Sequence, residues 1–597
     1  MGKSQSASEF AHRNASDYQV VWWFDAQDAS LIPGQIRQLL GELGEADAQR
    51  DDSSTLRALE PALERATSWL LVFDNVENPK SLSSWLPTLP GAAGQRRHVV
   101  ATTRRKGFDP FGPVRELPPL DVGAATQFLR HRIPEQDSGP ALELLAVSMQ
   151  GLPLALEQAC AYLKATGMGV NEYVVLFHTR TAEMLSKGEV LDHASLIATL
   201  WDLSLETLTP AALEFVETCA YLSSSAIPLS LFARHPDYLV DVLASVASDP
   251  VALSDVIGEV VDYSLARHFD STIIFHGLTQ AAVRARIPRD PMGYDLRLPN
   301  VLELLRASAP PLIIGGPDER SAVRSLEPLL PHVLFATGLY TLEEAKDEYT
   351  VKTCCDLISE SANYFQLAGN YTVAAMLYDA SRGLYASVAS NSVRRRARAL
   401  VDSAESRKRL GHPEVALPLA AAAVKLMIDE YGENDIDVAK DLGALARIQH
   451  DLGLLDEALD TGNRALAIAL KTDGPERSVV ATRLNDTALV HLQKGDAAHA
   501  RDLLEEAYDI VRAGDNNRAI GEILNNLGAA YEANGEVANA IEYDERSLGL
   551  LASEMGRLHP HLRNPISRLV ALYEKFGMAV FADHLRRWDA EISAPGI

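Results

Sequence analysis

The stretch LNNLGAAYEANGEVANAIEYDERSLGLL, residues 524–551, decides the fold of the C-terminal half. Its apolar and small residues recur at helical spacing on either side of Gly535, as Leu524, Leu527, Ala530 and Tyr531 and then as Ala540, Ile541 and Leu548. Gly535 suits a tight turn between two helices, because glycine adopts a positive φ at no steric cost. The stretch therefore predicts two amphipathic helices that pack against each other.

The same pattern recurs six times. Its glycines stand at intervals of 42, 42, 42, 40 and 42 residues, at Gly369, Gly411, Gly453, Gly495, Gly535 and Gly577. An alanine follows each glycine by five residues, at Ala374, Ala416, Ala458, Ala500, Ala540 and Ala582. A small residue precedes five of them by seven, at Ala362, Ala404, Ala446, Ala488 and Gly528, and Val570 holds that place in the sixth. Small residues let paired helices cross closely, so the sequence predicts a solenoid of about six helical hairpins.

These hairpins resemble the tetratricopeptide repeat, in the roughly 42-residue form seen in kinesin light chains, over about residues 355–590. The resemblance implies a concave groove, lined by the first helix of each pair, that binds an extended peptide or a protein partner. Three polar first-helix positions, Asn485, Asn525 and Asn526, are expected to clamp a peptide backbone, because a side-chain amide both donates and accepts hydrogen bonds. The alternatives are that these amides are merely solvated and that the array is a scaffold without a ligand.

The N-terminal third alternates apolar runs with helical stretches. The runs VVWWFDA (20–26), WLLVFDN (69–75) and HVVATTR (98–104) are typical of buried parallel strands, and helices are expected at 31–44 and 54–66. This alternation predicts an open parallel α/β sheet, in which ligands bind at the carboxyl ends of the strands. Asp74 and Arg104 lie at those ends.

The first residues carry a fragment of a phosphate-binding motif. A phosphate loop ends in Gly-Lys-Ser/Thr at the start of a helix, and Gly2-Lys3-Ser4 precedes an amphipathic helix with Ala7, Phe10 and Ala11. This position, one helix before a strand and 70 residues before the run that ends in Asp74, supports a nucleotide site. The same start also fits the myristoylation pattern M-G-x-x-x-S, but one acyl chain without a basic patch binds a membrane only weakly.

Together, residues 2–290 resemble the NB-ARC branch of the signal-transduction ATPases with numerous domains (STAND). The resemblance implies that Asp74 of FDN (73–75) is the Walker B acid and holds Mg²⁺ together with Ser4. It implies that Arg104 of TTRR (102–105) senses a terminal phosphate. It also implies that Pro153 of GLPLALEQA (151–159) covers the base. The histidine of SLARHFDSTIIFHGLTQAAVR (264–284), His276, would contact the bound diphosphate. With Gly2, Lys3 and Ser4 at the phosphates, the implied cofactor is ADP or ATP with Mg²⁺.

Three departures from the family pattern bear on activity. The resemblance places the first residues of this sequence within the Walker A loop, so we expect Lys3 to offer a point charge in place of the cradle of backbone amides that the family's strand and glycine-rich loop supply. Asn75 stands where a second acid is common, and an amide is no general base, so we expect at most a slow ATPase used as a switch. Gly277 replaces the aspartate of the MHD motif, which weakens the case for a lock by ADP.

The expected fold is a multidomain α/β and α protein with five segments. Residues 1–117 form a partial NB-ARC nucleotide-binding α/β domain with a P-loop-type parallel sheet, and residues 118–190 a helical domain with the GLPL motif. Residues 191–290 form a winged helix, which in this family is an interdomain clamp, and residues 291–350 a linker with helices. Residues 351–597 form the tetratricopeptide repeat solenoid.

Composition excludes several classes. The 597 residues include 81 acidic and 55 basic side chains, a net charge of −26 that disfavours nucleic acid as a partner. Four scattered cysteines suit a reducing cytosol and fit neither a disulfide framework nor a zinc site. No apolar run is long enough for a membrane span, and no secretory leader is recognised, so we expect no membrane partner.

The sequence therefore predicts a cytoplasmic signalling regulator, an ADP/ATP-dependent switch whose repeat array binds a peptide or protein. Self-assembly into an oligomer is left open. The alternative is a nucleotide-independent repeat scaffold with a degenerate or truncated NTPase module. A metabolic enzyme finds no support, because no nucleophile, base or metal-ligand constellation stands at useful spacing. Equilibrium binding of ATP or ADP separates the two remaining readings.

Overall fold

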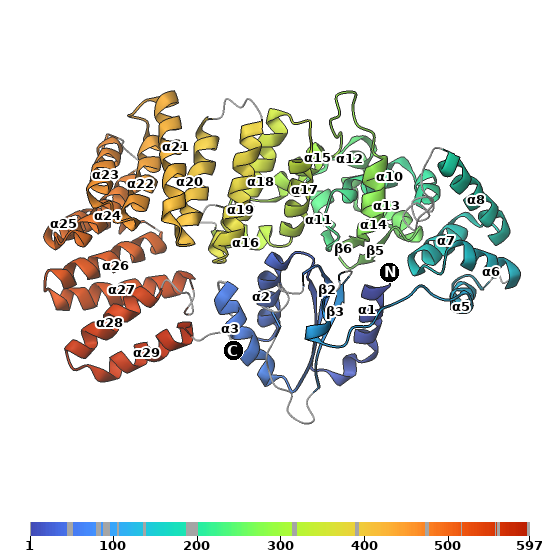
Figure 1. Ribbon diagram of the computed structural model, residues 1–597, viewed down its shortest axis with the longest axis horizontal. Helices are drawn as coiled ribbons and strands as arrows, with labels where there is room; N and C mark the ends of the chain where they lie inside the picture. The colour runs from blue at the N-terminus through green and yellow to red at the C-terminus, as the bar shows by residue number, and fades with distance from the viewer. Residues whose placement is uncertain are drawn as a thin grey trace.

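A computed structural model describes residues 2–44, 52–78, 85–86, 96–103, 105, 107–134, 139–186, 201–312, 319–387, 393–471, 477–514, 516–555, 557 and 562–593. Figure 1 shows a small sheet beneath a long curved row of helices, with a separate group of helices, α5 to α8, beyond the start of the chain. The row continues into paired helices that end at α29. None of the helices in the described ranges combines the length and the apolar composition that a bilayer crossing requires.

The sheet consists of three parallel strands in the order β1-β2-β3. They are β1 (Val20–Asp25), β2 (Ser68–Val76) and β3 (Arg96–Thr103), so the predicted parallel sheet is confirmed. Helix α1 (Lys3–Arg13) covers one face, where Ala7 and Ala11 pack on Leu70 and Val72. Helices α2 (Ile32–Glu42) and α3 (Asp52–Arg65) cover the other face, over the stacked rings of Phe24 and Phe73. In this register Asp25 lies opposite Asp74, at the carboxyl edge of the sheet.

The middle of the chain is mainly helical. The first group comprises α5 (Val122–Arg132), α6 (Gly139–Ser148), α7 (Pro153–Thr166) and α8 (Val170–Ser186). The next comprises α10 (Pro210–Ala220), α11 (Ser230–Arg234), α12 (Asp241–Ala247), α13 (Pro250–Asp262) and α14 (Gly277–Arg286). A small sheet joins this second group in the order β4-β6-β5, with β4 (Ile227–Pro228), β5 (Ala266–Phe269) and β6 (Thr272–Phe275). Strands β5 and β6 form an antiparallel pair.

Helices α15 (Leu298–Ser308), α16 (Glu319–Leu326) and α17 (Leu330–Leu342) lead into the array. Within the described residues the array has six helical pairs: α18 (Glu348–Leu367) with α19 (Tyr371–Ser387), α20 (Val393–Arg409) with α21 (Pro413–Tyr431), α22 (Ile436–Asp451) with α23 (Leu455–Ala469), α24 (Arg477–Gln493) with α25 (Ala497–Val511), α26 (Asn517–Ala533) with α27 (Val537–Met555), and α28 (Arg563–Lys575) with α29 (Ala579–Ser593). The predicted solenoid of helical hairpins is confirmed.

The turn of each hairpin has one recurring geometry. All six turn glycines have φ between 72° and 85°, as expected for the left-handed conformation that glycine favours. The amide after each glycine donates to a carbonyl five residues earlier, as His412 does to Arg407 at 3.0 Å, which satisfies the end of the first helix. The alanines five residues after the glycines are at most 1% exposed, so they mark the helix crossings. Val570, the exception in the pattern, is only partly buried.

Helix α2, which packs on the sheet, also contacts the beginning of the array. Nη2 of Arg37, on α2, donates to the Tyr364 hydroxyl on α18 at 2.8 Å, and that hydroxyl donates to Oε1 of Glu327 at 3.1 Å. A Cβ built on Gly34 would lie 3.1 Å from both the Tyr364 and Glu327 oxygens. A side chain at this position would therefore crowd the Tyr364 and Glu327 oxygens.

Candidate functional site

Three distant segments of the chain converge on residues 2–5. Oγ of Ser4 donates to Oδ1 of Asp74, at the end of β2, over 2.8 Å. A Cβ on Gly2 would stand 3.7 Å from Cγ of Pro153, at the start of α7. Nη1 of Arg267, on β5, donates to Oε1 of Gln5 at 2.6 Å. The start of the chain is thus held between the sheet, α7 and the small sheet, as Figure 1 also shows.

Asp74 is the centre of the hydrogen bonds at the sheet edge. Besides Ser4, the Thr102 hydroxyl at the end of β3 donates to Oδ1 of Asp74. The Thr102 hydroxyl also accepts from the Asn75 amide at 3.0 Å. Asn75 itself has φ 64° where β2 shifts its register, a conformation that asparagine tolerates better than most residues. The geometry therefore accounts for Asn75 without any catalytic role.

The GLPL segment is fixed to its neighbour by a glycine. Gly151 has φ 63°, and a Cβ built there would lie 2.0 Å from the carbonyl oxygen of Leu120. The Leu120 amide donates to the Gly151 carbonyl at 2.9 Å. Pro153 follows at the first position of α7, where its fixed φ suits a helix start. This packing places Pro153 beside Gly2.

Lys3 and Arg104 are the two basic residues that the sequence predicts at the phosphates. Lys3 is partly buried, and its ammonium makes no hydrogen bond or ion pair within the part of the chain that the structure describes. Arg104, the predicted sensor, lies outside the described residues. Among those residues, no cluster of three or more His, Cys, Asp or Glu side chains is arranged to hold a metal ion. Ser4 and Asp74 alone offer the hydroxyl and carboxylate oxygens that Mg²⁺ binds.

Asp25 links the sheet edge to the segment 223–225. Its Oδ2 accepts from the Ser225 hydroxyl at 2.5 Å and its Oδ1 accepts from the Gln27 amide at 3.2 Å. Burial raises the pKa of Asp25 above its ordinary value, against the effect of these two hydrogen bonds. Oγ of Ser224 donates to Oε1 of Gln27 at 3.1 Å. The segment 223–225 therefore contacts the chain at the carboxyl end of β1 through two hydrogen bonds.

His276 lies next to a residue that approaches that segment. It caps α14, where its Nδ1 accepts from the Leu278 amide at 3.2 Å, and its side chain is exposed. A Cβ on the next residue, Gly277, would lie 3.9 Å from Cβ of Ser224. The structure thus places His276 beside the segment that contacts β1. It shows no hydrogen bond from His276 to Gly2, Lys3, Ser4 or Asp74 among the described residues.

The three predicted amides of the array are linked to one another and to an arginine by hydrogen bonds. We call this chain of four residues the amide ladder: Asn485, Asn526, Asn525 and Arg568. Asn526 on α26 donates to Oδ1 of Asn485 on α24 at 2.8 Å, and Asn525 donates to Oδ1 of Asn526 at 3.3 Å. Nη2 of Arg568 on α28 donates to Oδ1 of Asn525 at 2.7 Å. All three amides are half-buried. The ladder therefore crosses three successive first helices, and each of its asparagines is partly accessible.

Charged side chains tie the earlier first helices together. Nη1 of Arg447 on α22 bonds Oδ2 of Asp486 on α24 at 2.9 Å, and its Nε bonds Glu405 on α20 at 3.1 Å. Burial raises the pKa of Glu405, but Arg447 and Lys408 outweigh it and lower the pKa to about 2. Arg483 adds a bond of 3.1 Å to Asp486. Charged pairs thus join the first helices of successive repeats from α20 to α24.

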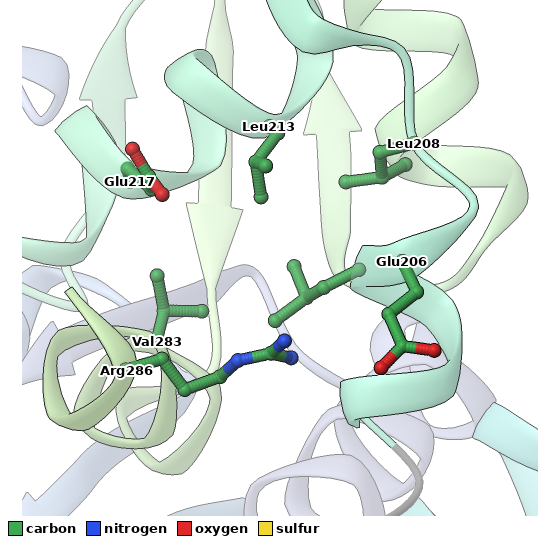
Figure 2. A pocket seen from close by; sticks show the side chains of 7 residues that line it. Glu206, Leu208, Leu213, Glu217, Val283 and Arg286 are labelled. Carbon is green, nitrogen blue, oxygen red and sulfur yellow. The ribbon is translucent and has the colours of Figure 1, made fainter. Parts of the chain in front are cut away.

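A separate cavity of about 270 Å³ lies elsewhere, and Figure 2 shows it. It is lined by residues of the segment 205–208, α10 and α14: Leu205, Glu206, Leu208, Leu213, Glu217, Val283 and Arg286. Two of its three charged residues are paired within the fold, Arg286 with Asp202 at 2.7 Å and Glu217 with Arg297 at 2.6 Å. None of the predicted site residues lines this cavity.

Sequence reasoning missed Thr102, Asp25, Ser225 and Arg568. Asp25 and Thr102 each stand at the carboxyl end of a strand, so the rule that selected Asp74 also applied to them. Arg568 stands nine residues before its turn glycine, as Asn526 does, so the repeat register pointed to it. Ser225 had no signal, since it is 200 residues from Asp25.

A comparison with known protein families identifies part of the C-terminal half. A tetratricopeptide repeat profile matches residues 395–471 and 437–513. These residues are tetratricopeptide repeats, as the sequence pattern predicts.

Two curated proteins extend the comparison. Regulatory protein AfsR of Streptomyces coelicolor is 24% identical over 579 residues, which cover 93% of this chain and 53% of AfsR. Protein Kinesin light chain-related 2 of Arabidopsis thaliana is 24% identical over 164 residues, which cover 27% of this chain and 25% of that protein. The chain thus spans about half the length of AfsR and a quarter of the plant protein, and it is similar to a regulatory protein over nearly all of its own length.

Two solved structures have related but loosely superimposable shapes. One is a STAND protein with a tetratricopeptide repeat sensor from Pyrococcus horikoshii, which is 12% identical to this chain. The match covers 99% of this chain and 95% of that protein, with a TM-score of 0.33. The other is a Rap protein complexed with competence and sporulation factor, which is 13% identical to this chain. The match covers 64% of this chain and 98% of that protein, also with a TM-score of 0.33. At these scores we draw no functional argument from either superposition.

Proposed function

We propose that this protein is a cytoplasmic STAND-type regulator with two sites. ADP or ATP with Mg²⁺ binds at the carboxyl edge of β1-β2-β3, and a peptide or protein partner binds in the groove of the repeat array. Differential affinity of the two ligands for a closed and an open arrangement couples the sites. The similarity to a regulatory protein over 93% of the chain agrees with this role.

The observation that carries the nucleotide site is the convergence at residues 2–5. Ser4 and Asp74 are 70 residues apart and meet at 2.8 Å, in the pairing that the P-loop motif requires of its Mg²⁺ ligands. Gly2 stands against Pro153, the residue expected over the base. The four buried cysteines are free, which agrees with a reducing compartment.

The residues fit a magnesium nucleotide at three points. Ser4 and Asp74 supply oxygen ligands, Lys3 supplies a partly buried cation, and α1 turns its N-terminus to the same place. The bound Mg²⁺ would neutralise phosphate charge. Asp74 is held by Thr102 and Asn75 has no acidic group, so this edge holds nucleotide and turns it over slowly at most.

Calorimetric titration of the purified chain with MgADP and MgATP tests the site. We expect saturable binding that Ser4→Ala weakens by about tenfold to a hundredfold, because a charge-assisted contact contributes about 1.5–3 kcal/mol. Ser6→Ala is the matched control, since Ser6 is an exposed serine two residues along the same helix. Equal affinities in both variants, or no binding at millimolar nucleotide, would refute the switch and favour the scaffold.

The amide ladder carries the proposal for the groove. Its half-buried asparagines on α24 and α26 are held by one another and by Arg568 on α28, so little entropy is lost when a peptide backbone binds them. We expect Asn526→Ala to weaken peptide binding about tenfold or more while changing thermal stability little. Thr482→Ala on the exposed part of α24 is the control. An unchanged affinity in Asn526→Ala would show that the peptide lies elsewhere.

A further inference from the structure

One carboxylate on the groove side of the array has no partner. Asp441 on α22 is 8% exposed and makes no hydrogen bond or ion pair with any residue in the described ranges. Among those residues, several unpaired polar atoms of the array are sealed from solvent, such as Nε of Arg483 and Oγ1 of Thr487, but no oxygen of Asp441 is. The part of Asp441 that remains accessible therefore includes its carboxylate.

The direction of Asp441 follows from the faces of α22. Val438 and Leu442 pack into the core of the array, and the half-exposed residues Lys440 and Arg447 lie on the opposite side of the helix. Asp441 stands between these two faces, one helical turn after Asp437. Its carboxylate therefore opens at the margin of the groove, towards α20.

The charged groups around Asp441 do not neutralise it. Nε of Arg398 on α20 is engaged by Oδ2 of Asp402 at 2.9 Å, and Nζ of Lys440 by Oδ1 of Asp437 at 3.0 Å. Nη1 of Arg394, also on α20, pairs with Oδ2 of Asp437 at 2.7 Å, so Asp402 and Asp437 each have a cationic partner and Asp441 has no direct one among the described residues. Burial raises the pKa of Asp441 to about 7, and Asp437 and Asp402 add to the rise while Arg398 and Lys440 oppose it.

The rest of this face contrasts with Asp441. At the same repeat position on α24, Arg483 bonds Asp486 at 3.1 Å and two backbone carbonyls of α22. Glu405 is held by Arg447. Because a buried charge is costly unless it is paired, one accessible and unpaired carboxylate among paired ones marks a place for a cation from outside. The net charge of −26 also favours approach of a basic partner.

We infer that Asp441 receives the side chain of a lysine or arginine in the peptide that the groove binds. This inference rests on the proposed peptide groove and adds the chemistry of its ligand. Helices α22, α24 and α26 are successive first helices, so Asp441 lies one repeat from Asn485 and two from Asn526. Neighbouring helix axes lie about 10 Å apart, and an extended peptide advances about 3.3 Å per residue. The basic residue is therefore about three residues from the one held at Asn485.

Selection from a phage-displayed library of random dodecapeptides tests the inference on the full chain. We expect the wild-type protein to enrich lysine and arginine about tenfold at one peptide position. In Asp441→Asn this enrichment falls to the level of the unselected library, although peptides are still selected. Asp460→Asn is the matched control, because Asp460 is an exposed aspartate on α23, outside the groove.

A second measurement separates recognition from folding. Replacing the basic residue of a selected peptide by methionine weakens binding to the wild-type chain about tenfold and leaves binding to Asp441→Asn unchanged. The melting temperature of Asp441→Asn equals or exceeds that of the wild type, because a buried unpaired charge is removed.

Several results would overturn the inference. These are selected peptides without basic residues, an equal basic preference in Asp441→Asn, or a clear loss of stability in that variant. If the wild-type chain selects no peptides, the proposed groove fails with it. If selection depends on Asn526 but not on Asp441, only this inference fails.

Discussion

Replacement of Gly151 by alanine gives the sharpest test of how the predicted nucleotide edge is assembled. The new Cβ would lie 2.0 Å from the Leu120 carbonyl oxygen and 3.0 Å from its carbon, so the backbone at Leu120 must move. The same change at Gly167 adds a Cβ at φ 69° with nothing within 4 Å. Both glycines flank α7, so the pair separates steric conflict from the cost of a left-handed backbone.

The two costs differ in size. A non-glycine residue in the left-handed region costs about 1 kcal/mol at either position. At Gly151 the displaced backbone also strains the Leu120 amide hydrogen bond of 2.9 Å, which contributes about 1 kcal/mol, and overpacking adds about 1–3 kcal/mol. We therefore expect Gly151→Ala to destabilise this region by about 3–5 kcal/mol and Gly167→Ala by about 1 kcal/mol.

Hydrogen exchange is the suitable assay, because a chain of several domains does not unfold in one step. An extra 2–4 kcal/mol corresponds to opening of α7 about 30-fold to 1,000-fold more often than in Gly167→Ala. Pro153 would move away from Gly2, so the exchange of the first turn of α1 should rise as well. Similar exchange of α7 in the two variants would refute the argument that the Leu120 contact positions the GLPL segment.

Two further changes test the array, with thermal denaturation followed by circular dichroism. In Gly443→Ala the new Cβ would lie 1.4 Å from Nη1 of Arg483, and we expect a loss of about 2–3 kcal/mol. Gly383→Ala, in a helix with open space around it, should gain up to about 1 kcal/mol, and equal midpoints would contradict the role of Arg483. Burial raises the pKa of Glu360 to about 7, so the fold keeps a proton that the unfolded chain releases near pH 4.3. The contribution of Glu360 to stability should therefore fall by about 1.4 kcal/mol per unit as pH rises from about 4.5 to 7 and stay level above that, and Glu360→Gln should make the slope of the whole chain shallower by that amount. Parallel profiles for the wild type and Glu360→Gln would contradict that assignment.

The repeats and strands could be predicted because their signals are local. Helical periodicity, a turn glycine and a small crossing residue all fall within one repeat, and the structure places Gly535 at φ 82° and Ala540 at 0% exposure. The apolar run at 69–75 likewise needs only its own residues to mark a buried strand, and β2 covers it. Phe10 shows the limit of such reasoning, since its helical face predicts burial and yet the side chain is 42% exposed.

The remaining contacts of the candidate site depend on distant partners. Ser225 meets Asp25 only because the segment 223–225 folds back onto β1, and no spacing of residue types in the sequence reports that fold. Thr102 belongs to the TTRR motif (102–105), but its hydroxyl is oriented by the register of β3 against β2. Residue types could therefore name Ser4 and Asp74, whereas the tertiary fold was needed to find what holds Asp74.

The sheet edge has two physical routes to the rest of the chain. On one side Asp25 accepts a hydrogen bond from Ser225, so a change in charge at the neighbouring Asp74 acts across one strand spacing on the carboxylate that contacts the segment 223–225. On the other side α2 follows β1 directly and bonds Tyr364 in the first helix of the array. Close packing at Gly34 leaves this second route little freedom to slide. A displacement of β1 would therefore change the contacts of both the segment 223–225 and the array. A switch that couples a nucleotide site to a repeat groove requires such a physical connection.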